Sequence, residues 1–325
     1  MVRRIRRTPW EKLSLTNNCT LGPLNKPVAT IKPDETIEVE TWGCYKSPRN
    51  RTKNDCEGNT VRSSRAVKET RRKNVLSFEN PITGPIYVEG AKPGDSLKVE
   101  IIDVKLPNVG WTSARATFGE LAGWLPLPQP PTKFSRINDG RITFALNDGR
   151  MIEIPAEPFI GTIGVSPAFE AISTTTPGRH GGNMDVSDVC VGNTLYLPVA
   201  TDGALLGLGD VHAVQGDGEI CGTAVEIPAR VKLKVGLEKN KELDWPRIES
   251  KSEIVTVCSS KPLEDATRLA FLELIKWLEK DYDFERYDAY MLLSLAARAR
   301  IAQIVDPLFT VVAKLPKKIL PKRRA

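Results

Sequence analysis

Two glycine-rich segments contain both of the chain's histidines, and each segment also contains carboxylates. The first is PGRHGGNMD at residues 177–185, and the second is GDVHAVQGDGE at residues 209–219. Glycine lets the backbone approach a ligand closely, and imidazole and carboxylate groups are suited to bind Zn²⁺ or a similar ion. The residue types and their spacing therefore predict a metal site.

The second segment is predicted to be a hairpin that presents acids and an imidazole to one place. Side chains alternate along a strand, so Asp210 and His212 would point to the same face, and Asp217 and Glu219 would do so after the turn. A simpler interpretation stays open. Gly-Asp-Gly is a common turn, and Asp217 could serve only to stabilise its backbone.

The elements that position these segments are predicted to be mostly strands. Turn signals such as Lys92-Pro93-Gly94-Asp95 separate strand-like runs across the first two-thirds of the chain. After residue 258, apolar residues recur at helical spacing, which predicts helices over 261–282 and 283–305, the second of them well buried. Strands followed by helices favour an α+β, mainly β fold: a β-sandwich-like body with a C-terminal helical segment packed on it.

Two parts are expected along the chain. Residues 1–235 would form a β-rich body that carries the glycine-rich motifs, with a basic insert at about 46–73. Residues 236–325 would form a C-terminal α+β part with two helices and a basic tail.

The composition is that of a soluble globular protein, with 41% hydrophobic and 26% charged residues among 325. No run approaches the roughly 18 apolar residues of a membrane-spanning helix, and no apolar core follows the N-terminal arginines, so neither a membrane span nor a secretory signal is expected. The six cysteines are widely spaced and form no CxxC pair. A cytoplasmic location with reduced thiols is the expectation.

The net charge of +6 is unevenly distributed. Residues 1–7 contain four arginines and no acid, residues 46–73 contain ten basic residues against three acids, and six basic residues follow from Lys314 onward. The remaining body is therefore acidic. Nucleic acid is not an expected partner, because the basic insert lacks the aromatic side chains on which bases stack.

Several long motifs resemble those of the acetamidase/formamidase family. They are PITGPIYVEGAKPGD at 81–95, PGRHGGNMD at 177–185, LGLGDVHAVQGDGEICGTAVE at 206–226 and YMLLSLAARARIAQIVD at 290–306. The resemblance covers residues 27–316. It implies hydrolysis of a small aliphatic amide, such as formamide or acetamide, to a carboxylate and ammonia. It also implies a cytoplasmic homo-oligomeric enzyme with a β-rich fold and a metal-dependent site.

The chain departs from the family pattern at three positions. The family usually has histidine where this chain has Asn80, an acidic residue near Gly43, and aspartate where Arg298 stands. If the missing groups contribute to the site, the activity or the substrate has changed.

Metal-assisted amide hydrolysis is the leading hypothesis, with a divalent ion, zinc or alternatively calcium, that activates a water molecule. The candidate metal ligands are His180, Asp185, Asp210 and His212. Glu219 is the candidate general base, and Asp217 is a second catalytic candidate. The candidate substrate-binding residues are Gly181, Gly182, Asn183 and Gln215.

Two alternatives remain. Cys190 or Ser173 could act as a nucleophile in covalent catalysis, although Cys190 is more simply interpreted as a core thiol. The chain could also be a divergent, non-catalytic relative that binds a small molecule at the site or a polyanion through the basic insert.

Overall fold

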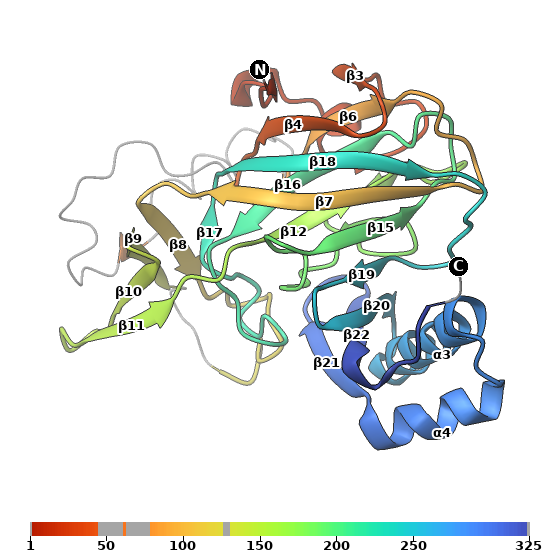
Figure 1. Ribbon diagram of the computed structural model, residues 1–325. Coiled ribbons are helices and arrows are strands. Elements are labelled where there is room, and N and C mark those ends of the chain that lie inside the picture. The colour runs from red at the N-terminus through yellow and green to blue at the C-terminus, as the bar shows by residue number, and fades with distance from the viewer. Residues whose placement is uncertain (1, 45–60, 63–78, 126–130, 324–325) are drawn as a thin grey trace.

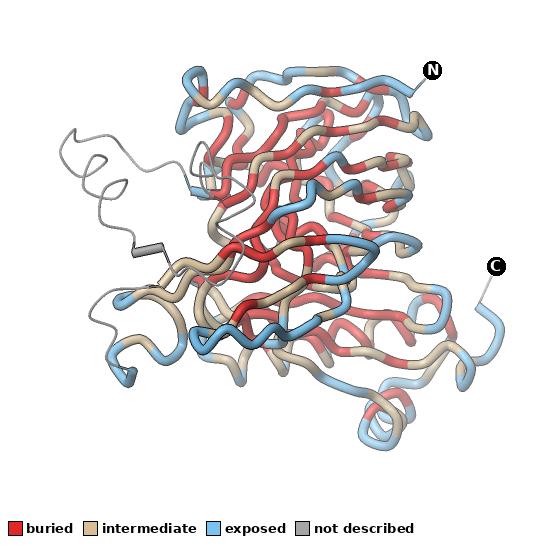
Figure 2. Tube along the Cα trace, turned by 90° about the vertical axis from the view of Figure 1, so that its left-hand side faces the viewer, coloured by how far each residue is buried: buried red, intermediate tan, exposed pale blue. Residues whose placement is uncertain are grey.

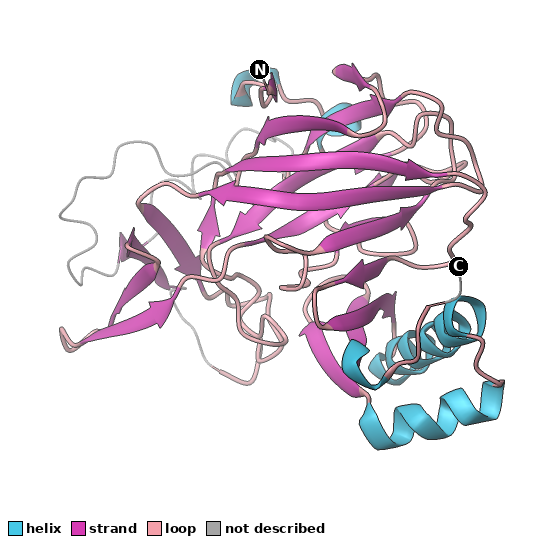
Figure 3. Cartoon of the chain, in the orientation of Figure 1, coloured by secondary structure: helices cyan, strands magenta, loops and turns pink. Residues whose placement is uncertain are grey.

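A computed structural model describes residues 2–44, 61–62, 79–125 and 131–323, and two large β-sheets packed face to face dominate it (Figures 1 and 3). The basic insert predicted at 46–73 lies outside the described residues, apart from residues 61 and 62. Two helices near the C-terminus pack beside one end of the sheets (Figure 1). The prediction of a mainly β, sandwich-like body with a C-terminal helical segment is confirmed.

One sheet contains nine strands in the described part of the chain. Their order is β1 (Arg3–Ile5), β4 (Glu35–Glu40), β18 (Arg230–Glu238), β7 (Ser96–Lys105), β15 (Thr194–Pro198), β19 (Arg247–Glu249), β20 (Glu253–Ser260), β22 (Phe309–Pro316) and β21 (Arg298–Gln303).

The other sheet contains eleven described strands and carries the glycine-rich segments. Its main path is β11 (Met151–Pro155), β10 (Arg141–Ala145), β9 (Pro131–Asn138), β8 (Val109–Ser113), β17 (Glu226–Ile227), β16 (Leu206–His212), β12 (Phe159–Gly164) and β14 (Gly181–Asn183). Off this path, β6 (Thr83–Val88) pairs with β16, β3 (Ala29–Ile31) with β6, and β5 (Val61–Arg62) with β9. Strands β2 (Thr20–Leu21) and β13 (Ile172–Ser173) pair with each other in a separate two-stranded sheet. The short elements also include α1 (Leu15–Asn18) and the 3₁₀ turns η1 (Trp10–Lys12) and η3 (Lys317–Ile319).

The main core lies between the two sheets, where the buried residues concentrate (Figure 2). Strand β4 has the sequence ETIEVE, and its alternation buries Ile37 and Val39 while the glutamates face outward. From the opposite sheet, Ile160, Leu208 and Val211 join the same cluster. Burial of such side chains contributes about 25 cal/mol per Å² of apolar surface and holds the sheets in fixed register.

A second core lies under helix α3 (Leu263–Tyr282), which packs on β20 and β22. Its buried residues recur at helical spacing and meet an apolar strand face; they include Ala266, Ala270, Leu274, Leu278, Ile254, Cys258, Val311 and Ala313. The first predicted helix, over 261–282, is confirmed, except that it begins at Leu263.

The second predicted helix, over 283–305, is wrong in both length and burial. Helix α4 (Arg286–Ala296) ends at Ala297, which is extended, and residues 298–303 form strand β21. Pairing of β21 with β22 satisfies the backbone there, and this tertiary contact overrides the helical spacing. In α4 only Ala289 and Leu293 are buried, whereas Leu295 is 85% exposed.

The predicted boundary between residues 235 and 236 falls inside β18, and one sheet continues from that strand to β21. The C-terminal strands therefore extend the same sheet as the N-terminal ones. Among the described helices, none has the length and apolarity that a membrane span requires.

Candidate metal centre

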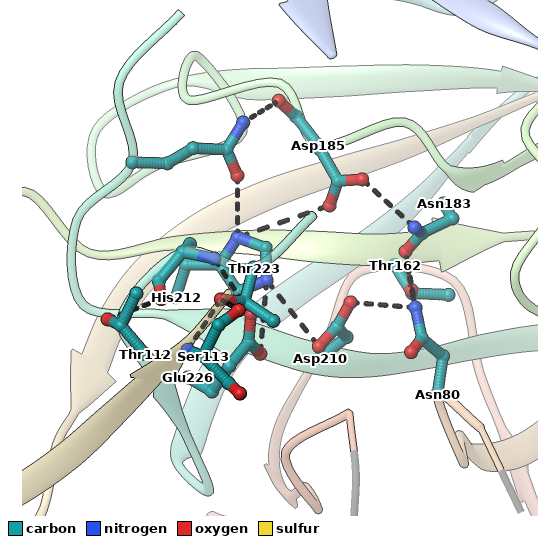
Figure 4. A network of polar contacts seen from close by, with 12 residues as sticks. Asn80, Thr112, Ser113, Thr162, Asn183, Asp185, Asp210, His212, Thr223 and Glu226 are labelled. Carbon is teal, nitrogen blue, oxygen red and sulfur yellow. Dashed lines mark hydrogen bonds and ion pairs between the residues drawn. The ribbon is translucent and has the colours of Figure 1, made fainter. Parts of the chain in front are cut away.

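Strands β12 and β16 form the floor of the site, and every residue of both is buried. In β16, an added side chain at Gly207 or Gly209 would meet Ile82 or Pro81. Regular alternation would turn the next residue away, but Asp210 adopts a left-handed backbone with φ of 51°. This conformation directs Asp210 to the side where Asn80 lies, and His212 follows on the same face (Figure 4).

The imidazole of His212 is held in one tautomer by Gln215. The Gln215 Nε2 group donates to the carbonyl oxygens of Asp185 (3.1 Å) and Ala302 (3.0 Å), so its Oε1 atom must be an acceptor. That oxygen lies 2.8 Å from Nδ1 of His212, which therefore carries a hydrogen. The neutral ring then presents the Nε2 lone pair to the other side.

Two carboxylates face that lone pair (Figure 4). Asp210 Oδ1 lies 3.5 Å and Glu226 Oε2 lies 3.4 Å from His212 Nε2. The backbone N–H of Ala224 donates to the other Glu226 oxygen and fixes this carboxylate in place. Among the described residues these three atoms have no hydrogen-bond partner, an arrangement that favours a cation or an additional proton.

Asp185 is oriented by a chain of buried amides. Asn80 Nδ2 donates to Asp210 Oδ2 and to Asn183 Oδ1, each at 2.8 Å. Asn183 Nδ2 in turn donates to Asp185 Oδ2 (2.9 Å) and Asp306 Oδ2 (2.7 Å). Thr162 also donates to the Asn183 oxygen, so every hydrogen-bonding position of this amide is used.

Within the described residues, four buried atoms of this cluster have no hydrogen-bond partner. They are Asp185 Oδ1, Asp210 Oδ1, His212 Nε2 and Glu226 Oε2. Buried polar atoms are nearly always paired, because an unpaired one costs about 1–3 kcal/mol. These four atoms come from strands β16 and β17 and from the loop after β14, so their convergence suits a ligand that accepts electron pairs.

Space for such a ligand is preserved by glycine at position 161. A Cβ atom there would lie 2.6 Å from Asp185 Oδ1 and 2.7 Å from the Asp210 carbonyl oxygen. Asn80, Asp185, Asp210 and Glu219 also have positive φ angles between 44° and 51°. Residues other than glycine adopt this conformation at a cost, and such residues cluster at functional sites.

The charges of the cluster are strongly coupled. Burial raises the pKa of Asp185 and Glu219 well above their usual values, and neighbouring carboxylates raise them further. Burial also raises the pKa of Asp210, to about 6. Burial acts to lower the pKa of His212, but Glu226 and Asp210 outweigh it and hold that pKa well above the usual range. Without a cation, the protein therefore retains protons in this cluster.

Three groups of side chains have ligand atoms within 4.8 Å of one another in the described part of the chain. They are Asp185, Asp210 and His212; His212, Glu219 and Glu226; and Cys44, Asp210 and Glu226. Imidazole and carboxylate donors suit Zn²⁺ and related ions. The donor set and its unpartnered atoms fit a divalent metal ion.

Of the six predicted metal ligands and catalytic residues, four belong to these groups and two, His180 and Asp217, do not. His180 is buried with its Nε2 atom unpartnered, and burial lowers its pKa to about 4, yet no described donor group includes it. Asp217 points outward, is 56% exposed and pairs with Arg300 at 3.2 Å. Gly181 and Gly182 lie in β14 beside β12, with positive φ angles of 89° and 84°.

The predicted hairpin is wrong in its second half. Strand β16 ends at His212 and pairs with β17, so Asp217 and Glu219 belong to a loop rather than a strand. This loop docks on the C-terminal part: the Gly218 N–H donates to Ile301 O (3.0 Å) and the Ile304 N–H donates to Gly218 O (3.1 Å). The docking turns Glu219 inward and leaves Asp217 outside.

Three members of the cluster were not among the predicted site residues. Cys44 follows β4, Glu226 begins β17, and Asp306 lies between β21 and β22. Glu226 and Asp306 lie within motifs that resemble the family, but their spacing from the histidines gave no local signal. Only the sheet pairing of β16 with β17 places Glu226 opposite His212.

Comparison with known proteins identifies relatives of this chain. The model of the Acetamidase/Formamidase family matches residues 165–322. A formamidase of Methylophilus methylotrophus is 25% identical over 284 residues, which are 71% of this chain. The chain spans 66% of that relative's length.

Two solved structures match nearly the whole chain. An acetamidase of Bacillus halodurans has a TM-score of 0.82 at 32% sequence identity. The match covers 96% of this chain and 97% of the Bacillus halodurans chain. An acetamidase of Yersinia enterocolitica has a TM-score of 0.84 at 35% identity and covers 99% of this chain. Because this match extends over 94% of the Yersinia enterocolitica chain, the protein belongs to the acetamidase/formamidase family.

Proposed function

We propose that this protein hydrolyses a small aliphatic amide, such as formamide or acetamide, to a carboxylate and ammonia at a metal centre. Family membership and the acetamidase and formamidase names of its relatives support the reaction. The observation that carries the metal centre is the convergence of three buried atoms without hydrogen-bond partners: His212 Nε2 and the carboxylate oxygens of Asp210 and Glu226 that face it at 3.4–3.5 Å.

Asp185, Asp210 and His212 would hold the ion, with Glu226 beside the same imidazole nitrogen. When bound, a divalent ion supplies Lewis acidity, which lowers the pKa of a water molecule and polarises the amide carbonyl. Gln215 keeps the imidazole in the tautomer that can bind metal. Asn183 and Asn80 orient the carboxylates of Asp185 and Asp210 through hydrogen bonds. We therefore assign the two amides predicted to bind substrate, Asn183 and Gln215, to positioning these ligands.

Glu219 is our candidate for the general base. Its side chain is buried, and burial raises its pKa. A carboxylate oxygen of Glu219 lies within 4.8 Å of possible metal-ligand atoms of His212 and Glu226. A carboxylate with a raised pKa accepts a proton more readily near neutral pH. Glu219 would take a proton from the attacking water and deliver it to the amide nitrogen as the C–N bond breaks and ammonia leaves.

The test combines elemental analysis with an ammonia-release assay on the same preparations. The purified protein should contain a divalent transition metal, and prolonged chelation should remove both the metal and ammonia release from small amides. Re-addition of the ion should restore release. His212→Ala should lose metal and turnover together, whereas Asn25→Ala, which removes a buried amide outside the donor cluster, should keep both.

Two outcomes would contradict the proposal. Full activity in a metal-free preparation would exclude the metal centre as the catalytic group. Metal binding without ammonia release from any small amide would favour the alternative of a non-catalytic relative that binds a small molecule at the site.

A further inference from the structure

We propose that Cys44 is a thiolate ligand of this centre and that the thiolate makes the centre selective for zinc over calcium or magnesium. The proposal rests on the proposed metal site and adds a residue outside both glycine-rich segments. It starts from one juxtaposition: the Cys44 sulfur and carboxylate oxygens of Asp210 and Glu226 all lie within 4.8 Å of one another.

Backbone hydrogen bonds hold the segment of Cys44 against the site from two sides. The Asp210 N–H donates to the Trp42 carbonyl at 3.2 Å, and the Asn80 N–H donates to the Cys44 carbonyl at 2.9 Å. Both donors belong to residues whose side chains contact each other in the cluster. Cys44 itself is 5% exposed, so its sulfur has a fixed place beside the two carboxylates.

Cys44 packs in an apolar cluster with Trp111 and Phe134, but it differs from an ordinary core thiol because two acids also lie beside its sulfur. Cys258, for comparison, is fully buried within the apolar cluster of α3, β20 and β22. Among the described cysteines, Cys44 alone belongs to a group with two carboxylate donors. A buried thiol normally acts as a small apolar side chain, and that role does not account for two adjacent acids.

The unpartnered atoms connect the thiol to a cation. Asp210 Oδ1 and Glu226 Oε2 are buried without hydrogen-bond partners, and both also face His212 Nε2. The sulfur shares these two carboxylates with His212, although Cys44 and His212 belong to different donor groups. A cation held by the sulfur and the two carboxylates would satisfy oxygen atoms that the described residues leave unpaired.

The donor types decide which cation the site prefers. Calcium and magnesium select oxygen donors, whereas zinc binds thiolate, imidazole and carboxylate together. On binding, the metal–sulfur bond replaces the S–H bond, and the thiol proton leaves to solvent. The thiolate therefore settles the choice between zinc and calcium in favour of zinc.

Cobalt substitution tests the proposal directly. The metal-free full-length protein is loaded with Co²⁺, and thiolate ligation is expected to give an intense sulfur-to-cobalt charge-transfer band in the near ultraviolet. Cys44→Ser should abolish the band and weaken zinc binding at least about 100-fold, above what loss of a supporting residue costs. Cys258→Ala, which removes a thiol outside the donor group, should retain both the band and the affinity.

The outcomes separate this proposal from the proposed function. A wild-type cobalt protein without the band, or a band that persists in Cys44→Ser, would overturn the thiolate ligand whatever the activity. A band without ammonia release would support the ligand and count against amide hydrolysis. If Cys44→Ser does not fold, Cys44→Ala and the wild-type spectrum still decide the question.

Discussion

Replacing Gln215 with alanine removes the group that selects the tautomer of His212. The imidazole would then lose the acceptor that holds hydrogen on Nδ1, and the ring could rotate or protonate at either nitrogen. Because Gln215 does not belong to any of the donor groups in the described residues, the variant keeps every candidate ligand side chain. The variant therefore isolates the effect of orientation on metal binding.

The expected losses of stability and of metal affinity follow from the hydrogen bonds that the substitution removes. Gln215 takes part in three hydrogen bonds, to His212, to the Asp185 carbonyl and to the Ala302 carbonyl. Each contributes about 0.5–1.5 kcal/mol net, so the metal-free protein should lose about 2–4 kcal/mol of its free energy of unfolding. Loss of such a supporting residue lowers metal affinity about 10–100-fold.

Two measurements separate these effects. Competition with a chelator gives the zinc dissociation constant, and urea unfolding of the metal-free protein gives stability. Asn25→Ala is the matched control, because it removes a buried amide that holds the Thr20 carbonyl outside the donor cluster. That control should lose stability without a change in zinc affinity.

One result would refute the reasoning. If Gln215→Ala binds zinc within about twofold of the wild type while it loses stability as the Asn25 control does, the glutamine has no part in orienting the imidazole. The tautomer argument for the metal centre would then fail as well.

Further predictions concern three other places in the structure. Gly161→Ala puts a methyl group 2.6 Å from a site carboxylate oxygen and 2.7 Å from a backbone carbonyl oxygen, so this variant should lose both metal binding and stability, as checked by metal analysis and urea unfolding. Glu219→Gln should slow ammonia release by about 10²–10⁴-fold, whereas Asp217→Asn, at an exposed carboxylate, should change the rate by less than about threefold; equal losses would contradict the assignment of the base. Burial acts to raise the pKa of Asp95, but hydrogen bonds from Lys239 and two backbone N–H groups outweigh it and lower that pKa. Asp95→Asn should therefore destabilise the protein by about 1–3 kcal/mol at neutral pH, and urea unfolding should show this difference shrinking as acid protonates the wild-type carboxyl below about pH 4.

Local patterns predicted the strands and the first long helix well, because burial on one face leaves a regular period in the sequence. Strand β4 and helix α3 show this period clearly. The pattern failed for residues 298–303, where alternating arginines and small apolar residues fit a helix or an edge strand equally well. Pairing with β22 decides between them, and no local property of the sequence records that pairing.

The candidate site was predictable where its groups are close in sequence and unpredictable where they are not. Asp210 and His212 are two residues apart, so strand alternation predicts one face for both, although Asp210 reaches that face with a left-handed backbone. Cys44 and Asp306 reach the cluster only through the packing of distant segments. The outward position of Asp217 likewise depends on a loop that docks on the C-terminal part.

The docking of Gly218 on strand β21 has a consequence for how the centre forms during synthesis. Groups of the cluster lie as far apart in sequence as Cys44 and Asp306, and Gln215 needs the carbonyl of Ala302 to hold its orientation. The ribosome synthesises these residues in order, so the N-terminal residues of the cluster cannot reach their final positions until the last strands have been synthesised and paired. If the proposed centre binds metal, uptake of the ion would then be one of the final events of folding, and a bound ion would mark a chain that has completed its sheets.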